Sequence, residues 1–137
     1  MGRVINPETA GKERTRLTKA VVIAIRELMQ KSKPDDNTRD LAAFISLALG
    51  AIANTIDSSV VAWEKRGYWV KADRFRMDWA WSGRLAGDMR LAVLTADWQK
   101  VAQTVAQVAE RLNGIHVSHN HRMGTPWEGA YQKIKGD

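Results

Sequence analysis

Apolar positions recur every three or four residues along most of the chain, which is the pattern of helices packed by one face. Over residues 6–33, the apolar face comprises Leu17, Val21, Ala24 and Leu28. We expect Asn6 to cap this helix and Pro7 to open it, because the N–H that proline lacks would have no partner there. The helix should end near Lys33, since the residue before Pro34 avoids helical geometry.

The second apolar stretch predicts a helix from about Thr38 to Arg66, with Asn37 as its cap. Its apolar stripe consists of Leu41, Ile45, Ala48, Ile52 and Ile56. This stretch is the most apolar part of the chain, so we expect it to be the most buried. Gly67 is the residue type that follows a helix C-terminus, because it adopts left-handed backbone angles at no steric cost.

Two further helices are predicted, the first from about Tyr68 to Leu94 with an inward face of Phe75, Trp79, Ala86, Met89 and Val93. The second begins after Asp97, a good capping residue. Its apolar positions alternate at steps of three and four, a narrow helix-packing seam: Trp98, Val101, Val105, Val108 and Leu112. Asn113 and Gly114 should stop this helix.

The tail, residues 115–137, is more polar and irregular until Thr125-Pro126-Trp127-Glu128, which has the form of a capping box. Trp127, Tyr131 and Ile134 then follow at helical spacing, so we expect a short amphipathic helix that docks on something apolar. The chain is therefore predicted to be all-α: an antiparallel up-down-up-down four-helix bundle over residues 1–114, followed by the tail over 115–137.

Composition narrows the setting in which such a domain works. The 137 residues include no cysteine, which excludes disulfides and thiolate metal sites. We expect no membrane-spanning segment, because such a segment needs an apolar run of roughly 18 residues and we identify none. The first residues lack the pattern of a signal peptide. A cytoplasmic protein with no membrane partner is expected. The net charge is +6, with most of the excess in residues 1–33 and 68–96, which favours a polyanionic partner.

The first candidate binding surface is a row of cations on one face of the first predicted helix: Lys12, Arg16, Lys19, Arg26 and Lys33. Such a row would gain free energy from counterion release if it met a phosphate backbone. The alternative is an ordinary solvated helix face.

The second candidate surface lies on the third predicted helix, where Arg76, Ala80, Gly83, Gly87 and Arg90 share one stripe. Two glycines inside a helix cost up to about 1 kcal/mol each, so they suggest a need for close approach. A nucleic-acid backbone or another chain would satisfy that need, with Arg76 and Arg90 as phosphate ligands. Tight packing within the bundle is the alternative.

The aromatic residues form a third candidate, because the chain has six tryptophans. Trp79 and Trp81 are two apart, so we expect that they cannot both face the core. Trp69 or Trp81 should be exposed, and exposed aromatics usually mark an interface. Together with Trp127 and Tyr131 they are assigned to a subunit interface, with stacking on nucleic-acid bases as the alternative.

The remaining candidates concern catalysis and metals. His116, His119 and His121 lie within six residues, but no acidic or thiolate partner accompanies them, so no metal site and no cofactor are predicted. The spacing of Arg111 and His116 resembles the nuclease motif of the HEPN helical ribonucleases. No catalytic motif of another class is present, and the protein is expected not to be an enzyme.

Over roughly residues 14–114, and chiefly at the third and fourth predicted helices, the sequence resembles the Avd proteins, the accessory variability determinants of diversity-generating retroelements. The similar stretches run over residues 65–73 (KRGYWVKAD), 84–89 (RLAGDM) and 108–114 (VAERLNG). The resemblance implies a four-helix bundle that assembles as a ring, typically a pentamer. It also implies association with a reverse transcriptase and with template RNA or cDNA, in support of mutagenic cDNA synthesis.

The leading prediction is therefore a non-catalytic accessory protein that binds nucleic acid and a reverse transcriptase. The first alternative is an oligomeric helical scaffold that binds an acidic protein and no nucleic acid. The second is a ribonuclease that uses Arg111 and His116.

Overall fold

The computed structural model describes residues 7–136, with side chains from residue 9 onward, and this part of the chain is all-α. The helices are α1 (Pro7–Met29), α2 (Asp36–Lys65), α3 (Trp69–Leu94), α4 (Trp98–Arg111) and α5 (Ala130–Gly136). No strand occurs in the described range. The all-α prediction is confirmed, while the predicted cap at Asn6 lies outside the described residues.

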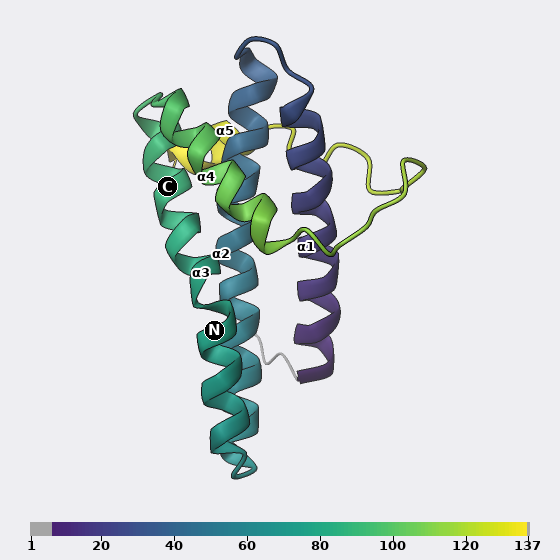
Figure 1. Ribbon diagram of the computed structural model, residues 1–137, viewed down its shortest axis with the longest axis vertical. Coiled ribbons are helices and arrows are strands. Elements are labelled where there is room, and N and C mark those ends of the chain that lie inside the picture. The colour runs from purple at the N-terminus through teal and green to yellow at the C-terminus, as the bar shows by residue number, and fades with distance from the viewer. Residues whose placement is uncertain (1–6, 137) are drawn as a thin grey trace.

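The helix α2 is the centre of the fold, with α1 packed on one side of it and α3 on the other (Figure 1). The shorter α4 packs on α3 and scarcely touches α1. The tail runs from α4 past α1 and returns to place α5 against α2 (Figure 1). The turn between α2 and α3 projects beyond α1 at the bottom of Figure 1, and the turn between α1 and α2 lies at the top.

The boundary between α1 and α2 differs from the prediction at both ends. α1 ends at Met29 rather than near Lys33, because the backbone N–H groups of Gln30 and Lys31 turn back to carbonyls three residues earlier. α2 begins at Asp36, and its cap is Asp35 instead of Asn37. The Asp35 carboxylate accepts a 2.8 Å hydrogen bond from the Thr38 N–H, and the Thr38 hydroxyl accepts a bond from the Asp35 N–H. This reciprocal capping box satisfies two donors at once, which favours a start of the helix after Asp35.

The turn between α2 and α3 and the start of α4 follow the prediction. Gly67 has φ +82°, and the Tyr68 N–H bonds to the carbonyl of Trp63 at 2.9 Å, as in a Schellman ending. Asp97 caps α4 by accepting a hydrogen bond from the Lys100 N–H. These short connections place α2, α3 and α4 next to one another in chain order.

The core follows the predicted stripes closely on α2 and α4. On α4 the seam is buried at Val101, Val105, Val108 and Leu112, and Trp98 packs against it. On α2 all five residues of the predicted stripe are buried. α3 buries a wider arc than predicted, because α2 covers one side of it and α4 covers another.

The tail helix docks as expected, although it begins later than the sequence indicates. Residues 126–129 form a turn, and Gly129 with φ +80° separates this turn from α5. Asp40 of α2 accepts hydrogen bonds from the N–H groups of Gly129 at 3.1 Å and Tyr131 at 2.9 Å. Trp127 and Ile134 are buried in the same core cluster as α1–α4, so the tail is part of that core.

One expectation about membranes needs correction. By length and composition alone, α2 does contain an apolar segment long enough to cross a bilayer. Half of that segment is buried inside the fold against its neighbouring helices, and the core helix of a soluble protein passes the same test.

Candidate nucleic-acid interface

The predicted row of cations on α1 is not one continuous surface. Lys12, Arg16 and Lys19 are exposed on the first half of the helix, but Arg16 is paired with Glu13 at 2.5 Å. That carboxylate holds the pKa of Arg16 above its ordinary value, mainly through the hydrogen bonds between them. Part of the positive charge expected here is therefore neutralised within the helix itself.

The second half of the row is covered by the tail. Arg26 is half-buried and donates a 2.6 Å hydrogen bond to the carbonyl of Val117. Ile23, on the same face, is buried, while Ile115, Val117 and Met123 of the tail pack against the core. Lys33 lies beyond the end of α1 in the following turn. Arg26 thus anchors the tail, a role that the helical spacing did not indicate.

The small-residue stripe on α3 faces outward over its whole length. Arg76, Ala80, Gly83, Gly87 and Arg90 are all exposed. A Cβ at Gly87 would meet nothing within 4 Å, and one at Gly83 would meet only Ala53 at 3.7 Å. Tight packing within the fold therefore does not explain Gly87.

Arg76, a predicted phosphate ligand, is occupied by two carboxylates. Its guanidinium binds Glu64 at 2.9 Å and Asp73 at 2.6 Å. The hydrogen bonds that Arg76 donates to Glu64, and then those it donates to Asp73, raise the pKa of Arg76. These contacts neutralise the two acids that flank the turn between α2 and α3.

Of the four aromatic residues assigned to an interface, one is exposed, two are buried and one is half-buried. Trp69 is 60% exposed, which meets the expectation that Trp69 or Trp81 is exposed, whereas Trp81 and Trp127 are only 6% and 5% exposed. Trp79 is half-buried, and its ring stacks on that of Trp81 with the ring centroids 5.7 Å apart. Tyr131 is half-buried, and the Arg39 guanidinium lies 4.5 Å from its ring centre. Trp127 is used by the chain's own core rather than offered to a partner.

The strongest candidate surface is the α2–α3 tip, defined here as the exposed residues Lys65, Arg66, Tyr68, Trp69, Val70, Lys71 and Arg74. Tyr68 and Trp69 are 53% and 60% exposed, and the Lys71 ammonium lies 4.5 Å from the ring centre of Trp63. Within the described residues, no ion pair joins these four cations to a carboxylate. The tip therefore combines unpaired positive charge with exposed aromatic rings.

Sequence reasoning singled out Trp69 but missed the cations around it. Lys65 and Arg66 were placed at the end of the second predicted helix and within the stretch similar to the Avd family, and were not assigned to a binding surface. The available signal was the composition of residues 65–71, KRGYWVK, in which cations bracket two aromatic residues without an acid between them.

The histidines of the tail are not gathered into a metal site. His116 and His119 are exposed, and His121 uses its Nδ1 to accept a hydrogen bond from the Met123 N–H at 3.2 Å. Among residues 9–136, no three histidine, aspartate or glutamate side chains are placed to hold a metal ion. Arg111 is exposed, and its guanidinium lies 6.0 Å from the ring centre of Trp81.

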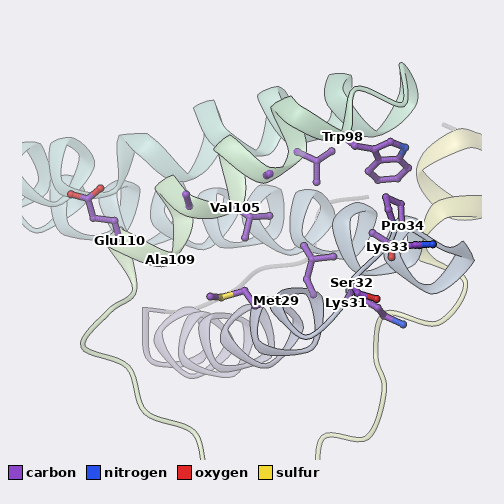
Figure 2. A pocket seen from close by; sticks show the side chains of 14 residues that line it. Met29, Lys31, Ser32, Lys33, Pro34, Trp98, Val105, Ala109 and Glu110 are labelled. Atoms are coloured by element: carbon purple, nitrogen blue, oxygen red, sulfur yellow. The ribbon is translucent and has the colours of Figure 1, made fainter.

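A second surface feature is an apolar groove between the end of α1, the α1–α2 turn and α4, which we call the α1–α4 groove (Figure 2). Its cavity volume is about 660 Å³, which is within the range of ligand-binding pockets. The apolar wall comprises Leu28, Met29, Trp98, Val101, Val105 and the alanines of α4, and charged residues stand at its rim.

Comparison of the chain with protein-family models, with curated proteins and with solved structures finds no match. The resemblance to the Avd family therefore stays a prediction.

Proposed function

We propose that this protein is a non-catalytic accessory protein that binds single-stranded nucleic acid through the α2–α3 tip. The observation that carries the proposal is the set of four unpaired cations around Tyr68 and Trp69. Cations supply the salt-dependent attraction to phosphates, and exposed aromatic rings supply a platform on which bases stack. Because stacking needs unpaired bases, single strands suit this surface better than a duplex.

The two acids nearest the tip do not oppose this binding. Glu64 and Asp73 are both held by Arg76, so their charge is balanced locally. The exposed cations Lys12 and Lys19 on α1 form a second, weaker candidate for the path of a longer strand. Arg90 of α3 is also exposed and stays a candidate.

Binding of a labelled RNA of about 20 nucleotides, followed by fluorescence anisotropy across a salt series, tests this proposal. Replacing Lys65, Arg66, Lys71 and Arg74 by glutamine should lower the slope of log affinity against log salt by about 3, since each phosphate contact on a single strand contributes about 0.7. Trp69→Ala should weaken binding by about 1–3 kcal/mol while leaving that slope unchanged.

The matched control replaces Lys133 and Lys135 by glutamine, which removes exposed charge from α5 instead. This control should change the slope by less than one. If the tip variant and the control behave alike, the tip is not the binding surface. Loss of RNA integrity in the same samples, abolished by His116→Ala, would instead support the ribonuclease that uses Arg111 and His116.

The reverse transcriptase is proposed as the protein partner on the sequence resemblance alone, and mutagenic cDNA synthesis as the process served. Co-purification of the two proteins tests this step: a tagged copy of this chain should retain a reverse transcriptase encoded beside its gene. A reverse transcriptase that does not associate would leave nucleic-acid binding intact and remove the retroelement assignment.

The arrangement proposed for the helices is an up-down-up-down four-helix bundle of α1–α4 with α5 packed beside it. Short turns between successive packed helices support this topology. Hydrogen exchange should protect α2 most strongly, because it packs against both α1 and α3.

One observation favours the alternative of an oligomeric scaffold. Val70, Met77 and Leu91 recur at multiples of seven along the outward side of α3, and they are 75%, 77% and 65% exposed. Exposed apolar side chains in a row are typical of a subunit interface. A ring such as a pentamer should then dissociate in Met77→Glu/Leu91→Glu when mass is measured in solution. A scaffold of this kind, unlike the accessory protein, would show no salt-dependent binding of RNA.

A further inference from the structure

The α1–α4 groove exists because two helices that flank the same core fail to close on one another. α4 packs on α3 and α1 packs on α2, but α1 and α4 scarcely touch. Val101 and Val105 line this space from α4, while Met29 on the opposite wall is 74% exposed. Because the space is bordered by a helix on each side, a further helix could pack into it.

The wall formed by α4 is built from small residues at helical spacing. Ala102, Ala106 and Ala109 follow one another at steps of four and three and all line the groove. The glutamines of the same helix, at 99, 103 and 107, are exposed and do not line it. Alanines leave room for another backbone to come close, and their spacing matches the ridges of a helix.

The two ends of the groove carry opposite charge (Figure 2). Lys33 is exposed at the α1–α2 turn and has no ion pair within the described residues, whereas its neighbour Lys31 is paired with Asp35 at 3.2 Å. Glu110 is exposed at the far end of α4. From Trp98 to Glu110 the wall is about 18 Å long, or roughly three helical turns.

We propose that this groove binds one amphipathic helix of a partner protein. The bound helix is about three turns long, inserts an apolar ridge between α1 and α4, and carries an acidic residue at the Lys33 end and a basic residue at the Glu110 end. Helix-in-groove recognition of this kind uses anchors at positions i, i+4 and i+7. A fatty acid would match Lys33 but would leave Glu110 without a counter-charge, so a helix with two oppositely charged ends fits the rim better.

Helix binding in the groove is independent of nucleic-acid binding, because the α1–α2 turn that borders the groove and the α2–α3 turn lie at opposite ends of the molecule (Figure 1). Variants of the tip should leave the groove intact, and groove variants should leave RNA binding unchanged. Failure of one proposal is therefore distinguishable from failure of the other.

The probe is a labelled helical peptide of about 14 residues with a leucine ridge, glutamates in its first turn and lysines in its last turn. A second peptide has the same ridge but lysines at both ends. The wild-type protein should bind the first peptide about threefold more tightly than the second, as expected for exposed charge pairs. Lys33→Glu places an acid at both ends of the groove and should reverse this preference.

Filling the groove provides the second arm. Ala106→Trp should weaken binding of the first peptide at least tenfold, whereas Gln103→Trp, on the outward side of the same helix, should not change it. Ala102→Trp repeats the test if Ala106→Trp does not keep the helical circular dichroism of the wild type.

Three outcomes would overturn the proposal: no peptide binding at about 1 mM, equal binding by the Ala106→Trp and Gln103→Trp variants, or a preference between peptides that Lys33→Glu leaves unchanged. Binding of laurate that is lost in Ala106→Trp, without peptide binding, would identify the groove as a site for small amphiphiles and would also overturn it.

Discussion

Replacing Ile134 on α5 by alanine tests whether the tail is docked as the fold requires. Ile134 is only 1% exposed and belongs to the same buried cluster as the core residues of α2. Truncating a buried isoleucine to alanine costs about 2–5 kcal/mol, because apolar burial is lost and a cavity remains. A terminal helix of seven residues can relax more easily than a central one, so we expect about 3 kcal/mol. For a domain of this size, that loss lowers Tm by about 10 °C.

Urea unfolding followed by far-UV circular dichroism measures this loss, with Lys133→Ala as the control. Lys133 is exposed on the same helix, and its replacement should change the free energy of unfolding by no more than about 0.5 kcal/mol. Trypsin cleavage at the exposed Arg122 should be faster in Ile134→Ala, because the tail is less firmly held. If the two variants unfold alike, α5 is not docked in solution and the reasoning is wrong. Trp127 would then be available to a partner after all.

The pKa of Asp35 lies below its ordinary value, first because its carboxylate accepts the cap hydrogen bond at the start of α2. Because this pKa is lower in the folded state, the ionised carboxylate stabilises the fold at pH values above its unfolded-state pKa of 3.8. The stabilisation is lost as the pH falls through the folded-state pKa. The urea midpoint of Asp35→Ala should therefore fall less than that of the wild type between pH 6 and about pH 3. Gly67→Ala should destabilise by about 1–2 kcal/mol because its φ is +82°, whereas Gly87→Ala should stabilise by about 0.5–1 kcal/mol, both measured by urea unfolding. Arg76→Gln should weaken RNA binding severalfold in anisotropy, and replacing its two carboxylate partners by amides in the same chain should restore it. Persistent weakness would mean that Arg76 touches phosphate itself.

The periodicity of apolar residues was sufficient to predict which residues are buried where one face of a helix packs against one neighbouring helix. On α4, four of the five predicted seam residues are buried, since a single face packs inward, and Thr104 is buried beside them. On α3 the same reasoning failed at Trp81, because two helices cover α3 from different sides and widen its buried arc. How many neighbours a helix has is a tertiary property that a single helical pattern does not contain.

The roles of some predicted site residues could not be predicted either, because they depend on tertiary contacts between distant parts of the chain. Arg26 falls on the predicted basic face, yet a carbonyl of the tail, far along the chain, accepts its hydrogen bond. The capping of α5 by Asp40 likewise joins residues about ninety positions apart. Neither contact leaves a signature in the spacing of residues along one helix.

Some of the ion pairs in the structure, however, could be predicted from the sequence. Arg16, Arg39 and Arg76 each pair with an acid three residues earlier, so part of the neutralised charge follows the spacing of the sequence. Lys65, Arg66 and Lys71 have no acid three or four residues away on either side, and Arg74 has only Asp78, with which it forms no ion pair in the described range. Unbalanced cations therefore gather where α2 gives way to α3, beside the two most exposed aromatic rings of the fold. A polyanion that contains planar bases is the ligand that would use both features, which is why the tip outranks the longer row of cations on α1.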